Sequence, residues 1–205
     1  IHKNGGNAVA IGVFLRKQGK AAGCKGRMEK PTDATMTSSP PDAARRYAIE
    51  MHGDQKYGPH PYVHHLDAVV ALLQPYGEKA RVIGYLHDVV EDTEATVSDV
   101  QSRFGDLVAA CVALLTDAPG ANRKERKART YAAMAQVTGD EELALVVKAA
   151  DRLANVRACV ADGHRQLWDT YRGEHPTFRA AAFRKGQCDP LWSKLDELLL
   201  EWTGS

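Results

Sequence analysis

The chain has 205 residues, of which 44% are hydrophobic and 26% are charged, and this composition excludes a wholly disordered protein. A net charge of +1 argues against a protein dedicated to coating nucleic acids or binding a membrane surface. No apolar run approaches the roughly 20 residues that span a bilayer. The four cysteines lie far apart without a Cys-x-x-Cys pair, so we expect a cytoplasmic protein with neither a disulfide framework nor a thiolate zinc site.

Residues 1–40 differ from the rest of the chain. They carry seven Lys and Arg against two Asp and Glu, and they are rich in Gly, Lys, Thr and Ser. Such a segment cannot bury enough apolar surface to offset the entropy lost on ordering. We therefore expect a flexible leader, either upstream or vector-derived sequence or a functional basic arm, followed by one domain over residues 41–205.

From residue 42 onward, apolar residues recur at the three- and four-residue spacing of helices. Thr96 and Asp99 are typical of a helix start, and Gly105 is expected to separate that helix from the next. No stretch alternates with the two-residue period of a strand, so the predicted fold class is all-α, a helical bundle. The later helices are expected over residues 107–115, 123–137, 141–160 and, in shorter segments, around 167–171, 178–183 and 191–202.

Residues 86–93, with the sequence LHDVVEDT, gather one imidazole and three carboxylates at the end of an apolar segment. On a helix, residues three and four apart share a face, so His87 would lie beside Glu91 and Asp88 beside Asp92. Carboxylates this close raise one another's pKa unless a cation neutralises them. The cluster therefore predicts a divalent metal site, and a solvated acidic helix end is the structural alternative.

Two further segments could complete such a site. His64 and His65 are adjacent, and neighbouring residues point in different directions, so we expect one of them to face inward. Asp151 stands among the apolar residues of a long helix, where a carboxylate must be protonated, paired or bound to a metal. Taken singly, a structural histidine or an ion pair between Asp151 and Arg152 is the simpler explanation. Taken together, two imidazoles and two carboxylates suit Mn²⁺, with Zn²⁺, Fe²⁺ and Mg²⁺ as alternatives.

Five segments of the chain share a pattern with one family. They are AIEMHGDQK at 48–56, PYVHH at 61–65, LHDVVEDT at 86–93, Phe104-Gly105 followed by LTD at 115–117, and KAADRLAN at 148–155. In this order they resemble the HD-domain metal phosphohydrolases, and within them the (p)ppGpp hydrolase domain of RelA/SpoT homologues, most closely the stand-alone small alarmone hydrolases. The resemblance covers roughly residues 42–160 and implies an HD-domain helical bundle. A bare His-Asp pair is a weak signal, but the five segments together are specific.

The resemblance implies roles for individual residues. Glu91 and Asp92 match the acidic pair that positions and activates the attacking water. Asn155 matches a contact to the sugar-phosphate portion of the substrate, and Lys56 falls near a basic contact to the purine. The chain has Leu66 where the long family members usually have Pro, which leaves His64 as a competitor for the first ligand position. The implied ligands of one Mn²⁺ per chain are His65, His87, Asp88 and Asp151.

The basic segment 123–129, RKERKAR, is expected to hold substrate phosphates through Lys124 and Arg126. Lys124, Arg126 and Lys127 span one helical turn, so at most two of them can face one ligand. A solvated helix face is the alternative. Tyr171 is the aromatic residue that we select for a nucleoside pocket, with core packing as its alternative. No interleaved aromatic or glycine-rich pattern accompanies the charge, so RNA binding is not expected.

The sequence thus predicts Mn²⁺-dependent hydrolysis of the 3′-pyrophosphate of ppGpp or pppGpp to GDP or GTP and pyrophosphate. The first alternative is an enzyme of the same fold that acts on the 2′-phosphate of NADPH, on pppApp or on another nucleotide. The second is a non-catalytic nucleotide-binding module. The expected partner is a small nucleotide rather than a nucleic acid or a membrane, and homo-oligomerisation is left open.

Overall fold

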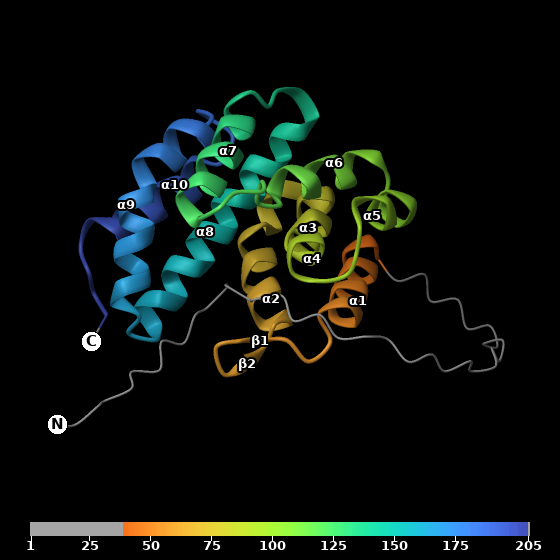
Figure 1. Cartoon of the computed structure of the whole chain (residues 1–205), viewed down its shortest axis with the longest axis horizontal. Coiled ribbons are helices and arrows are strands. Elements are labelled where there is room, and N and C mark those ends of the chain that lie inside the picture. Colours follow the sequence, from red (N-terminus) through yellow and green to blue (C-terminus); the bar gives the residue numbers. More distant parts are fainter. Residues whose placement is uncertain (1–38, 205) are drawn as a thin grey trace.

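A computed structural model of the protein describes residues 39–204, so the leader expected over residues 1–40 lies almost wholly outside the described residues. Within the described range the fold is helical, as predicted (Figure 1). Short 3-10 turns, η1 and η2, occupy Gln74–Tyr76 and Gly139–Glu142. The α-helices are α1 (Pro40–His52), α2 (Val63–Leu72), α3 (Gly77–Leu86), α4 (Val89–Asp92), α5 (Val97–Phe104), α6 (Asp106–Leu115), α7 (Arg123–Ala135), α8 (Leu143–Ala161), α9 (Arg165–Ala182) and α10 (Asp189–Leu200).

Local chemistry explains several helix boundaries. The amide of Asp99 donates to the hydroxyl of Thr96 at 3.2 Å, and the amide of Thr96 donates to the carboxylate of Asp99 at 2.9 Å. This capping box begins α5 at the predicted place. Gly105 has a φ of 89°, a conformation that glycine adopts without strain, and it separates α5 from α6 as predicted.

Two local features differ from the prediction. Lys56–Tyr57 (β1) and His60–Pro61 (β2) form an antiparallel hairpin, although no strand was expected. Strands of two residues are too short to show an alternating pattern. The separate helical segments expected around residues 167–171 and 178–183 are one helix, α9, which continues through Pro176 although proline has no backbone donor.

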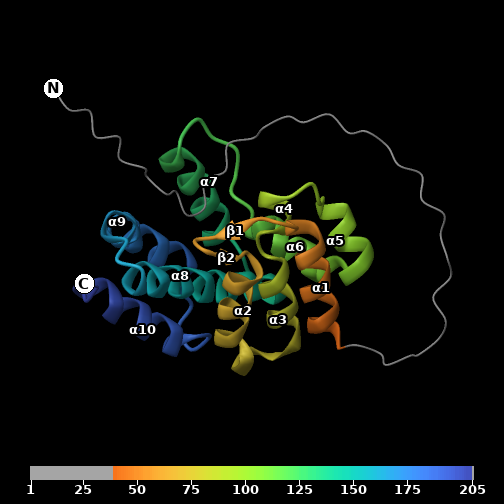
Figure 2. The same ribbon diagram turned by 90° about the horizontal axis from the view of Figure 1, so that it is seen from below.

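Helix α8 lies at the centre of the arrangement. It packs against α2, α3 and α6 on one side and against α9 and α10 on the other, while α1 lies against α3 and α7 against α9 (Figures 1 and 2). All of its residues from 144 to 154 are buried, among them the charged Lys148, Asp151 and Arg152. Burying a charge is costly unless the charge is paired. The partners of these three side chains therefore lead to the candidate functional site.

The remaining core is apolar and aromatic. Trp168 and Trp192 are buried in α9 and α10, so these tryptophans pack the core rather than a nucleoside pocket. Cys111, Cys159 and Cys188 are buried free thiols. No helix between residues 39 and 204 has the length and apolarity needed to cross a bilayer.

Candidate active site

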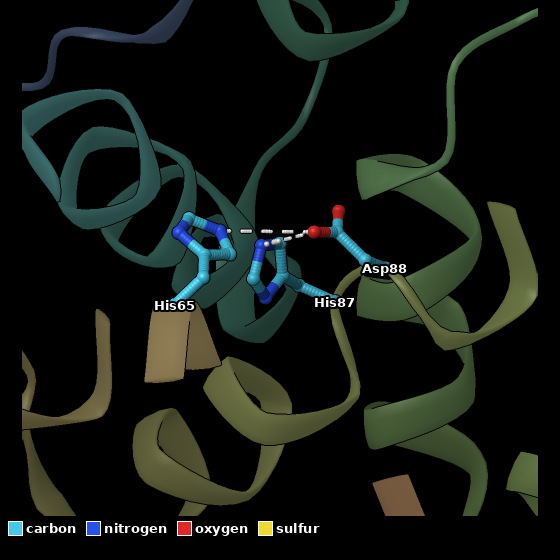
Figure 3. A group of neighbouring side chains, drawn as sticks. All are labelled: His65, His87 and Asp88. Carbon is cyan, nitrogen blue, oxygen red and sulfur yellow. Dashed lines mark ion pairs between the residues drawn. The ribbon is translucent and has the colours of Figure 1, made fainter. Parts of the chain in front are cut away.

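Three metal-binding side chains converge where α2 meets the α3–α4 corner. His65 lies in the first turn of α2, and His87 and Asp88 occupy the corner itself (Figure 3). One potential ligand atom of each lies within 4.8 Å of the others. The Nε2 atoms of His65 and His87 lie 3.7 and 3.0 Å from Oδ2 of Asp88. These three residues therefore form a candidate metal site.

The histidine orientations suit this arrangement. Nδ1 of His87 lies 2.8 Å from the carbonyl oxygen of Gly84, and a carbonyl can only accept, so Nδ1 carries the proton. Nε2 of His87 is buried and has no hydrogen-bond partner among the described residues, as expected of a nitrogen directed at an ion. His64 is exposed and stacks on His60, with ring centroids 4.4 Å apart. The structure thus brings His65, and not His64, to His87 and Asp88.

Asp151 reaches the same point from α8. Its Oδ1 lies 3.4 Å from Nε2 of His65 and 3.6 Å from Nε2 of His87. The same oxygen accepts a hydrogen bond from Asn155 at 2.5 Å, and Oδ2 lies 3.2 Å from Nζ of Lys148. The structure therefore brings together all four side chains expected to bind the metal. Two imidazole nitrogens and two carboxylates are a donor set that fits a divalent cation such as Mn²⁺.

The site demands a positive counter-charge. Burial favours the neutral form of Asp88 and Asp151, yet His87 and Lys148 hold the pKa of these carboxyls below the ordinary range. Burial also acts against a charged His87, but Asp88 and Asp151 raise its pKa well above the ordinary value. The ammonium group of Lys148, 3.2 Å from Asp151, supplies part of this counter-charge. A divalent cation would supply it when the imidazoles are neutral.

The acidic pair Glu91 and Asp92 lies beside this cluster. The backbone amide of Asp117 donates to Oε2 of Glu91 at 3.0 Å. The hydroxyl of Tyr62 lies 2.7 Å from Oδ2 of Asp88 and 2.8 Å from Oδ2 of Asp92. A hydroxyl has one proton and donates to only one of these carboxylates at a time. Burial and the nearby Asp88 raise the pKa of Asp92 to about 6.

Replacing Asp92 by Asn is expected to stabilise the metal-free protein at pH 7.5 by on the order of 1–3 kcal/mol. The pKa of Asp92 rises from 3.8 to about 6 on folding, so ionisation costs the folded state more than the unfolded state. That cost is absent below about pH 4, grows up to about pH 6 and is complete above it. Urea unfolding of both proteins should therefore show a gain at pH 7.5 that nearly vanishes at pH 4. An equal gain at both pH values would contradict this assignment.

A cavity opens from the candidate metal site. His65, Asp88 and Asp151 lie at its metal end. Five cationic side chains also line it, contributed by α7 and α8. The complete lining consists of Tyr57, Tyr62, His65, Asp88, Glu91, Asp92, Asp117, Arg123, Arg126, Lys127, Lys148, Asp151, Arg152, Asn155 and Tyr171.

The structure divides the residues predicted to bind substrate. Asn155, Arg126 and Tyr171 line the cavity. Lys56 and Lys124 are exposed and do not line it. Successive residues of a strand point to opposite faces, so the inward position of β1 belongs to Tyr57. On α7, residues three and four apart share a face, so Arg123 and Lys127 accompany Arg126 in place of Lys124.

Sequence reasoning missed several residues of the cavity. Tyr57 stacks on the imidazole of His65, with centroids 4.6 Å apart, and donates to Oδ1 of Asn155 at 2.7 Å. Arg152 lies between the rings of Tyr171 and Phe178, 4.6 and 4.7 Å from their centroids. Tyrosines carry no charge pattern that singles them out in a sequence. Lys148 did have a signal, because it stands one turn before Asp151 in an apolar helix.

An apolar pocket of about 250 Å³ adjoins the cavity and shares Tyr57 and His65 with it. Its apolar lining comes from one face of α2 and one face of α8. These residues are Ala68, Leu72, Ala154, Ala158 and Ala161.

Comparison with known proteins defines the class. The family model for the HD domain matches residues 44–187, so the chain belongs to the HD-domain family. Within that family it is related to ppGpp hydrolases. It is 30% identical over 168 residues to the guanosine-3′,5′-bis(diphosphate) 3′-pyrophosphohydrolase MESH1 of Danio rerio, a match that covers 76% of this chain and 89% of that protein.

Other relatives are longer. A probable guanosine-3′,5′-bis(diphosphate) 3′-pyrophosphohydrolase of Synechocystis is 33% identical over 117 residues, which cover 54% of this chain and 15% of that protein. The guanosine-3′,5′-bis(diphosphate) 3′-pyrophosphohydrolase of Aquifex aeolicus is 32% identical over 117 residues, which cover 56% of this chain and 17% of that protein. The chain thus spans about a sixth of these proteins. A solved structure described as a metazoan orthologue of SpoT that hydrolyses ppGpp superimposes with a TM-score of 0.63 at 27% identity, covering 80% of this chain and 96% of that one.

Proposed function

We propose that this protein is a Mn²⁺-dependent phosphohydrolase that removes the 3′-pyrophosphate of ppGpp or pppGpp and leaves GDP or GTP. The observation that carries the proposal is the cavity. A candidate metal site and five cationic side chains line it, and an apolar pocket adjoins it at Tyr57 and His65. A nucleotide with more than one phosphate group matches all three parts. The relationship to proteins named as 3′-pyrophosphohydrolases supports the same substrate class.

The parts of the cavity suggest how such a nucleotide would lie. The apolar pocket between α2 and α8 would take the base, because an aromatic ring gains from leaving water there. Tyr57 and Asn155 stand between that pocket and the metal site, where their polar groups can bind the ribose. Cationic side chains beyond the metal site would hold the pyrophosphate through charge-assisted hydrogen bonds.

The reaction replaces one bond to phosphorus by another. The oxygen of a water molecule bonds to the phosphorus attached to the 3′-oxygen, the bond from that phosphorus to the 3′-oxygen breaks, and the 3′-oxygen takes up a proton. His65, His87, Asp88 and Asp151 would hold the metal. When bound, the cation would polarise the phosphoryl group and make a coordinated water more acidic.

The remaining steps belong to side chains of the cavity. Glu91 and Asp92 stand on the wall next to the metal site, where they can orient the water and accept its proton. Lys148 is buried and keeps its charge, because Asp151 and neighbouring acids raise its pKa against the effect of burial. Its ammonium group, together with Lys127, can neutralise the charge of the pyrophosphate group while water attacks its phosphorus.

A substrate panel tests the proposal. The purified protein with Mn²⁺ would be given ppGpp, pppGpp, pppApp and NADPH, and pyrophosphate and orthophosphate would be measured separately. We expect pyrophosphate release with the highest kcat/KM on ppGpp or pppGpp, and loss of the activity with EDTA. Orthophosphate as the only product, or a preference for NADPH or pppApp, would contradict the proposed substrate. No turnover on any of the four would favour a non-catalytic module.

A further inference from the structure

Asp117 is an acid placed among the phosphate-binding cations. Its Oδ1 lies 2.8 Å from Nζ of Lys127, and its Oδ2 lies 3.9 Å from Nε of Arg126. The side chain is only 8% exposed, yet it lines the cavity. The other acids that line the cavity are the two carboxylates of the expected metal site and the pair proposed to activate water. Asp117 has neither of these roles.

The other acid that neutralises this region is placed differently. Glu174 receives two hydrogen bonds from Arg123, at 2.7 and 3.1 Å, and lies 3.3 Å from Nη2 of Arg152. Glu174 does not line the cavity. It holds the two arginines without being part of the cavity wall, whereas Asp117 belongs to the lining of the space that a phosphate would enter.

The side chain and the backbone of Asp117 have separate contacts. The backbone amide holds Glu91, and the amide of the next residue, Ala118, donates to the hydroxyl of Thr130 at 3.0 Å. Both of these bonds are made by backbone amides, and the carboxylate adds only a long contact of 3.4 Å from the Thr130 hydroxyl to Oδ1. The charge of Asp117 can therefore be removed while the bond to Glu91 is kept.

We propose that Asp117 is a positioning residue that limits the affinity of the cationic region for pyrophosphate. A phosphate that approaches Lys127 and Arg126 must share them with a fixed negative charge, and like charges at contact distance repel strongly in a partly buried site. The ion pair with Asp117 keeps Lys127 oriented in the free protein. The repulsion between the carboxylate and the phosphate favours departure of the product. The inference rests on the proposed function in one respect, namely that pyrophosphate occupies this part of the cavity.

The test is the affinity for inorganic pyrophosphate, measured by calorimetry on the full chain with EDTA present so that side chains alone are probed. Asp117→Asn keeps an acceptor for Lys127 but removes the charge, and we expect it to bind pyrophosphate about tenfold more tightly. Asp117→Glu keeps the charge and should bind within about threefold of wild type. Asp169→Asn is the matched control, because Asp169 pairs with Arg165 on the exposed face of α9, and its affinity should not change.

Turnover supplies a second measurement. If the protein hydrolyses the alarmone with Mn²⁺, Asp117→Asn should lower both KM and kcat and strengthen product inhibition by pyrophosphate, a pattern that general loss of structure does not produce. Asp117→Ser should act in the same direction if the Asn variant folds poorly. Unchanged or weaker pyrophosphate binding by the folded variants would overturn the inference. Because binding is measured without a substrate, failure of alarmone hydrolysis would be seen separately.

Discussion

Replacing His65 by Ala is expected to lower the affinity for Mn²⁺ by at least about 100-fold and to abolish hydrolysis. Nε2 of His65 lies 3.7 Å from Asp88 and 3.4 Å from Asp151, so its loss removes one of four converging donors. It also removes the imidazole that lies against both buried carboxylates. Calorimetric titration with Mn²⁺ and the assay for released pyrophosphate measure the two effects on the same preparation.

His64 offers a matched control for this prediction. Its imidazole is exposed and stacks on His60, so His64→Ala should bind Mn²⁺ with wild-type affinity. Both variants lose one imidazole from adjacent positions of α2, and the two imidazoles differ in direction and in burial. A similar loss of Mn²⁺ binding in both variants, or in neither, would contradict the placement of the metal site.

The candidate metal site could be predicted from the sequence, because histidine and aspartate are uncommon within or at the ends of apolar helices. His87 and Asp88 end an apolar helix, and Asp151 stands in the most buried part of α8. Residue spacing alone does not choose between His64 and His65, because the choice depends on the rotation of α2 about its axis; the family resemblance favours His65. Packing of α2 against α8 sets that rotation and turns His65 inward.

The face of α7 that lines the cavity could be predicted only in part. The composition of this segment predicts a cationic helix, but it does not predict which cations line the cavity. Three of them do, and Lys124 does not. Which cations face the cavity depends on how α7 packs against α9. There Arg123 pairs with Glu174, a residue 51 positions away in the sequence. The β1–β2 hairpin could not be predicted for a different reason. Its two-residue strands have no period, and its turn brings Tyr57 to the cavity through contacts with α2 and α8.

The acidic pair Glu91 and Asp92 and the candidate metal site consist of different side chains of the same cavity. Four side chains from α2, the α3–α4 corner and α8 would hold the cation, whereas Glu91 contacts the segment after α6 through the amide of Asp117. A change at Glu91 can therefore leave metal binding intact. This separation allows catalysis and metal binding to be tested independently.

Glu91→Gln is expected to lower kcat by about 10²- to 10⁴-fold, the usual contribution of a positioned general base, and to change Mn²⁺ affinity by less than about threefold. Glutamine keeps an oxygen that can accept the hydrogen bond from Asp117, so the wall of the cavity is preserved. It cannot accept a proton from water at neutral pH. Single-turnover hydrolysis together with Mn²⁺ titration of the same variant measures both quantities.

Glu94→Gln is the matched control for Glu91, because Glu94 is exposed three residues further along and does not line the cavity. Its kcat should equal that of wild type. If Glu91→Gln keeps wild-type turnover, Glu91 has no part in activating water. If Mn²⁺ affinity falls along with turnover, Glu91 supports the metal site instead. Only loss of turnover with retained Mn²⁺ assigns the carboxylate to the water, because an amide and a carboxylate of the same shape differ there in charge and proton affinity alone.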